Sequence, residues 1–244
     1  MVGRETLERA KELLMRDEEQ NIYPLLLLGQ GGVGACWISG GSVCLWDKQH
    51  NKYCYAVRSA SELRELFATV RQRGEASVSL LTDEKWMETV LALDGALLVN
   101  HCTQFRPVPY PGTPPTVPGV RFGGVDERVA EWILTVYDHP ELSVDFILRR
   151  AKAAPAIAAL NGQDAPVGFF ITHSNAELGP VYVNPSYRGS GLADALYAEM
   201  AGRLPKDEPW PILFVFPQNH ASQKWLRRLG CVPAPRQVAW FWKD

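Results

Sequence analysis

The sequence predicts an α+β fold with a mixed α/β sheet, and two observations support this prediction. Amphipathic helical segments and short apolar strand segments occur together along the whole chain. In the C-terminal half, three strand candidates follow one another directly, unlike the strict alternation of strand and helix in a parallel βαβ fold. The chain has 244 residues, of which 46% are hydrophobic and 21% charged, as in ordinary soluble globular proteins of one large or two modest domains.

The N-terminal part, residues 1–105, is predicted to form a divergent α/β lobe. Leucines and an alanine between Leu7 and Leu14 lie on one face of a first helix, with charges opposite. A polar turn joins two strand candidates, Ser42–Trp46 and Tyr53–Val57, as in a hairpin. Ser59 and Glu62 form a capping box, which predicts a helix ending at Gly74. A further helix is expected from Asp83 to about Leu93.

A proline-rich stretch, residues 106–119, separates this part from the rest of the chain. Its six prolines cannot lie inside helices or central strands. We therefore predict a stiff, extended linker between two lobes.

The C-terminal part, residues 120–244, is predicted to be the second domain. Its expected elements are helices at 126–136, 143–151, 191–204 and 221–229, and strands at 156–160, 167–172, 178–183, 212–216 and 238–242. The strands include neighbours in sequence, so a mixed sheet follows.

Two glycine-rich stretches are candidates for phosphate binding. The first, Gly29, Gly31 and Gly34, fits G-x-G-x-x-G, and the apolar run Leu25–Leu28 before it is compatible with a strand. Asp47 even lies near the distance expected for a ribose-binding acid. However, the residues after Gly34 are β-formers without helical period, so no helix N-terminus is there to bind a dinucleotide diphosphate. We interpret this stretch as a connection between strands.

The second stretch has the required context. The strand Leu178–Val183 ends at Asn184-Pro185-Ser186, and the turn that follows leads into a helix from Gly191 to about Leu204. Gly189 and Gly191 permit tight curvature and a close approach of ligand to backbone. An anion at this turn would meet both free N–H groups and the positive end of the helix dipole.

These residues resemble a known family. Val183 to Ala193 reads V-x-P-x-Y-R-G-x-G-L-A, which is similar to the acyl-CoA signature of the GNAT superfamily of N-acetyltransferases. Downstream, Asn219-His220-Ala221-Ser222 and then Leu229-Gly230-Cys231 resemble that family's last motif, with cysteine in place of phenylalanine. The segment Ala176-Glu177 ahead of Pro185 is closest to the glycine N-acyltransferase-like branch, which also places a divergent lobe first. The first lobe here is then a degenerate acyltransferase-like lobe.

The resemblance implies a binding site for acyl-CoA as co-substrate. In this fold the strand before the turn separates from its neighbour, and pantetheine pairs with it like another strand. We expect Val181, Tyr182 and Val183 to contact the coenzyme, with the Val181 N–H donating to the oxyanion. The diphosphate is expected on Arg188, Gly189, Ser190, Gly191, Leu192 and Ala193, with Asn219 and Ser222 closing the site. Arg188 has a second interpretation as a solvated loop cation.

Glu177 is the candidate general base, because the resembling branch carries its catalytic glutamate there. His173 is an alternative, although a lone histidine at a strand end is more often structural. Many family members have a thiolate-protonating tyrosine where this chain has Leu226. The sequence thus predicts a CoA-dependent N-acyltransferase, most simply an acetyltransferase, acting on a small amine or amino acid. The alternative is a catalytically impaired CoA-binding or dimerisation module of the same fold.

Composition excludes several other functions. The net charge of −2 lacks the basic excess of nucleic-acid-binding proteins. No Cys/His pairing has zinc-ligand spacing, and no apolar run is long enough to cross a membrane, so we expect neither a metal nor a membrane partner. The five cysteines are expected to be free thiols in a reducing, cytoplasmic compartment.

Overall fold

The computed structural model describes residues 2–74, 76, 78–95, 97–137, 142–174, 176–207 and 209–243. The chain forms two compact units, one combining Met1–Arg106 with Phe214–Asp244 and the other covering Pro107–Leu213. The C-terminal segment therefore groups with the N-terminal residues in packing. The functional division at residues 105 and 120 stays a prediction.

The first unit is built on a mixed sheet with a C-terminal strand in its interior. The strand order is β1 (Val33–Ser39), β2 (Ser42–Asp47), β3 (Lys52–Ala56), β4 (Val78–Leu81), β12 (Val238–Trp242) and β5 (Leu98–Arg106), with the short β11 (Val232–Pro233) beside β5. Within this order only β3 and β4 pair in parallel. Because β12 lies between β4 and β5, the end of the chain completes the N-terminal sheet.

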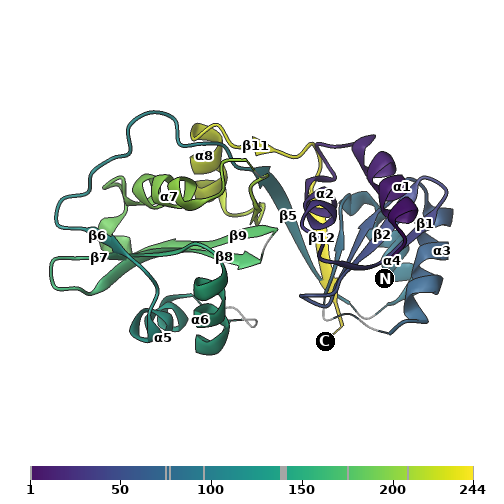
Figure 1. Ribbon diagram of the computed structural model, residues 1–244, viewed down its shortest axis with the longest axis horizontal. Coiled ribbons are helices and arrows are strands. Elements are labelled where there is room, and N and C mark those ends of the chain that lie inside the picture. Colours follow the sequence, from purple (N-terminus) through teal and green to yellow (C-terminus); the bar gives the residue numbers. More distant parts are fainter. Residues whose placement is uncertain are drawn as a thin grey trace. The chain divides into compact units, whose positions relative to one another are not determined.

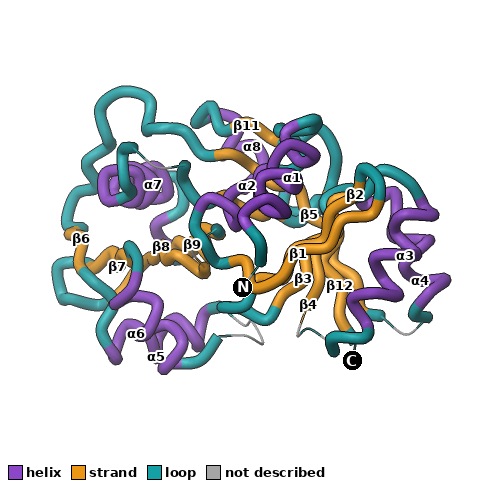
Figure 2. The backbone as a smooth tube through the Cα atoms, turned by 45° about the vertical axis from the view of Figure 1, so that its right-hand side comes forward, coloured by secondary structure: helices purple, strands orange, loops and turns teal. Residues whose placement is uncertain are grey.

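Helices cover both faces of this sheet (Figures 1 and 2). Helices α3 (Ala60–Arg71) and α4 (Met87–Leu93), the latter preceded by a 3₁₀ turn (Glu84–Trp86), contribute to an apolar core with Tyr55 and Phe241. Helices α1 (Arg4–Met15) and α2 (Ile22–Gly29) lie on the opposite face, and the unit also contains α8 (His220–Arg228). Burial of these amphipathic faces is the main stabilising contribution.

Local sequence signals located most of these elements correctly. The β2–β3 hairpin is confirmed, and Ser59 caps α3 by accepting a hydrogen bond from the Glu62 N–H. One expectation is wrong: Leu25–Leu28 belongs to helix α2 and is not a strand. Leucine favours helices and none of these four residues is β-branched, so a buried helix suits the run better.

The second unit is an antiparallel sheet joined by one parallel strand. Its order is β6 (Arg121–Gly123), β7 (Ala156–Leu160), β8 (Pro166–Ser174) and β9 (Glu177–Val183), all antiparallel. The beginning of β10 (Ile212–Val215) then pairs in parallel with β9. Helices α5 (Glu127–Val136) and α6 (Val144–Ala153) cover one face, and α7 (Leu192–Arg203) covers the other (Figure 1).

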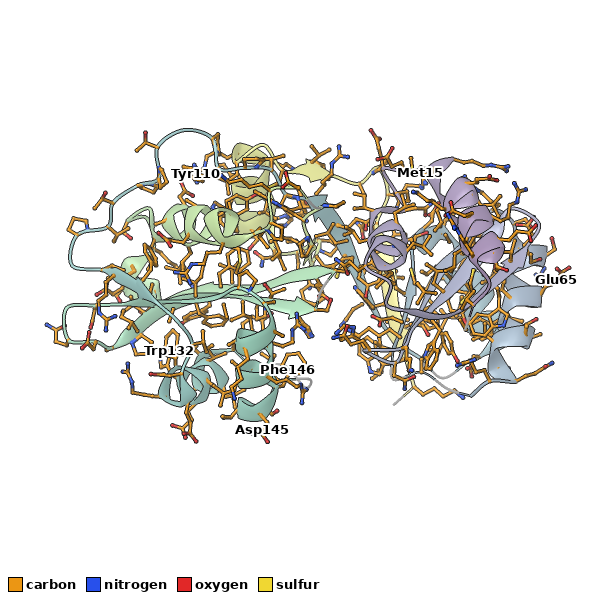
Figure 3. All side chains as sticks on the ribbon, in the orientation of Figure 1. Met15, Glu65, Tyr110, Trp132, Asp145 and Phe146 are labelled. Carbon is orange, nitrogen blue, oxygen red and sulfur yellow. The ribbon has the colours of Figure 1, made fainter. Side chains whose placement is uncertain are left out.

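The core of the second unit follows from strand alternation. Phe169 and Ile171 of β8 point to the α5–α6 side, where they pack with Ile133 and Ile147. Trp132 and Phe146 lie on this side in Figure 3, whereas Tyr110 lies on the α7 side. Asp126 and Ser143 cap α5 and α6 by accepting hydrogen bonds from backbone N–H groups, as their positions before amphipathic segments predict.

Candidate functional site

The turn between β9 and α7 has the backbone conformation of an anion-binding site. Gly189 and Gly191 have φ of 79° and 85°, in the left-handed region that favours glycine. Gly191 is the N-cap of the 12-residue helix α7, and no side chain caps that end. Within the described part of the chain, the N–H groups of Gly189, Gly191, Leu192 and Ala193 donate to no protein acceptor. The turn therefore offers several free donors beside a helix dipole.

Hydrogen bonds from preceding residues fix this turn. The Asn184 side chain accepts from the Ser186 N–H at 3.1 Å and from its hydroxyl at 2.7 Å. The Ser190 hydroxyl donates to the Tyr187 carbonyl at 2.7 Å, and the Ser190 N–H points to the same oxygen at 3.4 Å. Ser190 thus shapes the turn, which leaves less of its polar surface for a ligand. Its predicted coenzyme contact stays a prediction.

Arg188 is exposed beside these free donors. Among the described residues it forms no ion pair and its side chain makes no hydrogen bond. A guanidinium in this position can contact a diphosphate, and it can equally remain solvated, so both interpretations of Arg188 stand.

One edge of β9 is not covered by a strand over most of its length. Parallel pairing with β10 includes Glu177 and Leu178 alone, whereas β9 continues to Val183. On the other side, β9 stays paired with β8 up to Val183, with irregular register near Thr172. The two neighbours of β9 therefore differ: β8 follows it to the turn, and β10 leaves it after Leu178.

The register decides which backbone groups face this open edge. The Asn184 N–H donates to the Val167 carbonyl at 2.9 Å, so residues 184 and 167 form a hydrogen-bonded pair. Because such pairs alternate in an antiparallel ladder, Tyr182 and Phe169 form the next one, and the backbone groups of Val181 and Val183 point away from β8. The two residues predicted to pair with pantetheine thus present their N–H and C=O groups at the open edge.

Tyr182 is placed differently from its neighbours. Its ring stacks on Phe169, with centroids 5.9 Å apart, and meets Trp132 edge-on at the same distance. Its side chain is therefore part of the aromatic packing on the α5 side, and its backbone pairs with β8. A direct contact between Tyr182 and a coenzyme stays a prediction that this geometry does not favour.

The two candidate bases have different surroundings. Glu177 is half-buried at the start of β9, where β9 and β10 still pair. Its carboxylate has no hydrogen-bond or ion-pair partner among the described residues. His173 is 7% exposed on β8 and its ring lies 5.1 Å from that of Phe146. Glu177 is consequently free to accept a proton, and His173 is enclosed by packing.

The last predicted site residues belong to the first compact unit. Asn219 is exposed and caps α8, its side chain accepting from the Ser222 N–H at 3.1 Å. Leu226, at the position of the family's tyrosine, is completely buried, and its carbonyl accepts from the Cys231 N–H. Asn219 and Ser222 thus have a structural role in α8, and their part in the site stays a prediction.

The cysteines and the first glycine stretch are not part of this arrangement. No disulfide joins any of the five cysteines, all of which lie in the described residues, and burial raises the pKa of the Cys36 thiol to about 11. The first glycine stretch runs from the end of α2 into β1, so it connects a helix to a strand and the predicted connection between two strands is wrong. This order is the reverse of that in a dinucleotide fold. The described residues contain no cluster of three metal-ligating side chains, and no described helix combines the length and apolarity that crossing a bilayer requires.

Sequence reasoning missed two features. The proline-rich stretch packs against α7 near the turn, although its composition suggested only a spacer. The first unit also contains a cavity of about 330 Å³ with an aromatic lining that includes Tyr53, Phe67 and Trp242. The sequence predicted only some of the strands of this unit, so no pattern in the sequence pointed to the cavity between them and the helices.

Comparisons with known proteins bear on the family and the fold. Residues 126–231 match the Acetyltransferase (GNAT) family. A crystal structure of a Drosophila protein superposes with a TM-score of 0.68 at 13% identity, covering 96% of this chain and 94% of that one. A GCN5-related N-acetyltransferase from Kribbella flavida gives a TM-score of 0.59 at 16% identity, covering 91% and 94%.

A third solved structure is a tandem GNAT protein from the clavulanic acid biosynthesis pathway. Its TM-score is 0.51 at 16% identity, with 98% of this chain and 94% of that one covered. A comparison with curated protein sequences finds no match. At these identities the structural matches establish the fold alone, and they confirm the predicted mixed α/β class. The chain therefore has the GNAT fold, and its residues 126–231 match the acetyltransferase family of that name.

Proposed function

We propose that this protein is a CoA-dependent N-acyltransferase, most simply an acetyltransferase, that acts on a small amine or amino acid. The observation that carries the proposal is the open edge of β9 with its Val181 and Val183 backbone groups, leading into a turn with free N–H donors. An extended amide-containing arm that ends in a diphosphate fits these two features together. The GNAT family uses acetyl-CoA as co-substrate, which is such a molecule.

The roles of the residues follow from their positions. The N–H groups of Gly189, Gly191, Leu192 and Ala193 hold the diphosphate at the helix N-terminus. The Val181 N–H donates to the thioester oxygen as negative charge develops there. Glu177 lies at the start of the same strand, four residues before Val181, and accepts the proton that the attacking amine loses, through water that links the two groups. The glycine N-acyltransferase-like branch and a degenerate N-terminal lobe are parts of this proposal.

A second candidate is a CoA-binding module without catalysis, which the complete burial of Leu226 favours. A leucine cannot reprotonate the departing thiolate as the family's tyrosine does. However, a CoA thiolate is a stable enough leaving group at neutral pH to depart without an acid. We therefore prefer the enzyme, and we expect water to supply that proton.

Ligand-dependent thermal unfolding tests the binding step. A ligand present at 100 times its dissociation constant stabilises the folded state by about 2.7 kcal/mol. We expect CoA and acetyl-CoA to raise Tm and NAD to leave it unchanged. Gly191→Glu should abolish the CoA effect, because its carboxylate would occupy the diphosphate position, whereas Gly202→Glu at the exposed end of α7 should not. An unchanged Tm with CoA would refute the proposal.

Release of CoA then separates the two candidates. Acyl-CoA donors of increasing chain length are combined with a panel of amines and amino acids, and free thiol is measured. Turnover with any acceptor supports the enzyme. Tight CoA binding without turnover across the whole panel supports the module.

A further inference from the structure

The proline-rich segment, residues 107–119, is anchored to helix α7 at its beginning. The Tyr197 hydroxyl donates to the Val108 carbonyl at 2.7 Å and accepts from the Val108 N–H at 3.1 Å. Tyr197 is only 2% exposed, and the ring of Tyr110 lies 6.5 Å from its ring. Both backbone groups of Val108 are thus satisfied by one buried side chain, which holds the segment on the helix.

The same segment reaches the phosphate-binding turn further along. The Cβ and Cγ atoms of Pro115 would lie 3.5 and 3.7 Å from a Cβ placed on Gly191. Pro115 therefore lies beside the N-cap of α7, at the distance at which a methyl group on Gly191 would touch it. The segment runs over α7 in both views of the backbone (Figures 1 and 2).

The composition of the segment suits a wall beside an anion. Residues 107–119 contain no Asp, Glu, Lys or Arg. An apolar ring beside Gly191 lowers the dielectric on that side of the turn, which strengthens the interaction between N–H donors and a diphosphate. It brings no carboxylate that would repel the diphosphate, and the hydrocarbon ring of Pro115 has no acceptor that could occupy the free donors.

We propose that the proline-rich segment is a wall of the coenzyme site, in which Pro115 covers the diphosphate turn and Tyr197 is the positioning residue that holds the segment there. This inference rests on the proposed function, because it concerns the same coenzyme. It assigns to residues 107–119 a contribution to coenzyme affinity in addition to connecting the two units. The wall acts on the diphosphate and not on the pantetheine arm.

A charge placed on the wall tests this directly. Pro115→Asp puts a carboxylate beside the diphosphate and should weaken CoA binding about tenfold. Pro115→Asn removes the proline without adding charge, so it should weaken CoA binding by about threefold at most. Pro205→Asp is the matched control, because this exposed proline follows the other end of α7, about 20 Å away, and should leave CoA affinity unchanged.

Calorimetric titration with CoA and with pantetheine gives the readouts. We expect Pro115→Asp to change the dissociation constant of CoA and not that of pantetheine, which has no diphosphate. The difference between Pro115→Asp and Pro115→Asn should shrink at high salt, because it is electrostatic. A general loss of structure would instead weaken both ligands and would not respond to salt in this way.

Tyr197→Phe tests the anchor independently. Loss of the hydroxyl leaves the Val108 N–H and C=O without partners, so the segment should loosen and CoA affinity should fall severalfold, again without an effect on pantetheine. Amide hydrogen exchange at Gly112, Thr113 and Thr116 should slow when CoA binds wild type and slow less in this variant.

The outcomes distinguish the wall from the proposed function. If wild type binds CoA and Pro115→Asp binds it as tightly as Pro205→Asp does, the wall is wrong and the acyltransferase site stands. If Pro115→Asn or Tyr197→Phe binds CoA more tightly than wild type, the segment obstructs the site and the inference is also wrong. If wild type binds no CoA, the proposed function fails and the wall fails with it.

Discussion

Replacing either of two glycines of helix α7 by alanine should have opposite effects on stability. Gly191 has φ of 85°, where an L-residue is strained by about 1–2 kcal/mol. A Cβ there would meet Pro115 at 3.5 Å, an ordinary contact, so backbone strain and not a clash determines the cost. Gly202 lies exposed in the same helix with nothing within 4 Å of its Cβ position. Alanine there should stabilise by about 0.5–1 kcal/mol.

Thermal unfolding of the two variants measures the difference. One kcal/mol shifts Tm by about 2–4 °C in a chain of 150–250 residues, so Gly191→Ala should lower Tm by about 2–8 °C and Gly202→Ala should raise it by about 1–4 °C. CoA affinity should fall about tenfold in Gly191→Ala alone, because relief of the strain turns the N–H donors away from one point. If both variants are equally stable and bind CoA equally, Gly191 is not held in the left-handed conformation and the reasoning fails.

Three further predictions concern catalysis, packing and thiol reactivity. Glu177→Gln should keep CoA affinity near wild type and lower turnover by about 10²-fold, as measured by CoA release with the best acceptor of the panel; unchanged turnover would refute the base. Leu226→Tyr should lower the free energy of unfolding by about 1–3 kcal/mol in urea without raising turnover, because the side chain it replaces is completely buried; a faster enzyme would show that a tyrosine fits there. Because burial raises the Cys36 pKa to about 11, its thiol is almost entirely protonated at pH 8, and iodoacetamide should alkylate it about 10²-fold more slowly than a free cysteine; equal rates would contradict the burial.

Local signals in the sequence determined most of the secondary structure. The cap at Ser59 located a helix start, because a side-chain acceptor before an amphipathic run satisfies the first free N–H groups whatever the helix packs against. The helical pattern of residues 126–136 and 143–151 located two more helices. The strand, turn and helix around Gly191 were likewise predicted from the sequence, since glycine is favoured where φ lies above zero. The test of helical context also separated this turn from the first glycine stretch.

Only the tertiary structure decided which elements meet. The leucine run of α2 is apolar at all four positions, so its pattern alone does not separate a buried strand from a buried helix, and the fold shows a helix with Leu26 and Leu27 buried. The C-terminal strand β12 pairs between β4 and β5, and no local pattern records a partner more than a hundred residues away. The open edge at Val181 exists because β10 leaves β9 after Leu178. Pro115 lies near Gly191 because Tyr197 holds the proline-rich segment on α7. These arrangements depend on which surfaces are buried against each other. The amino-acid pattern indicates which residues can be buried, but not which other residues bury them.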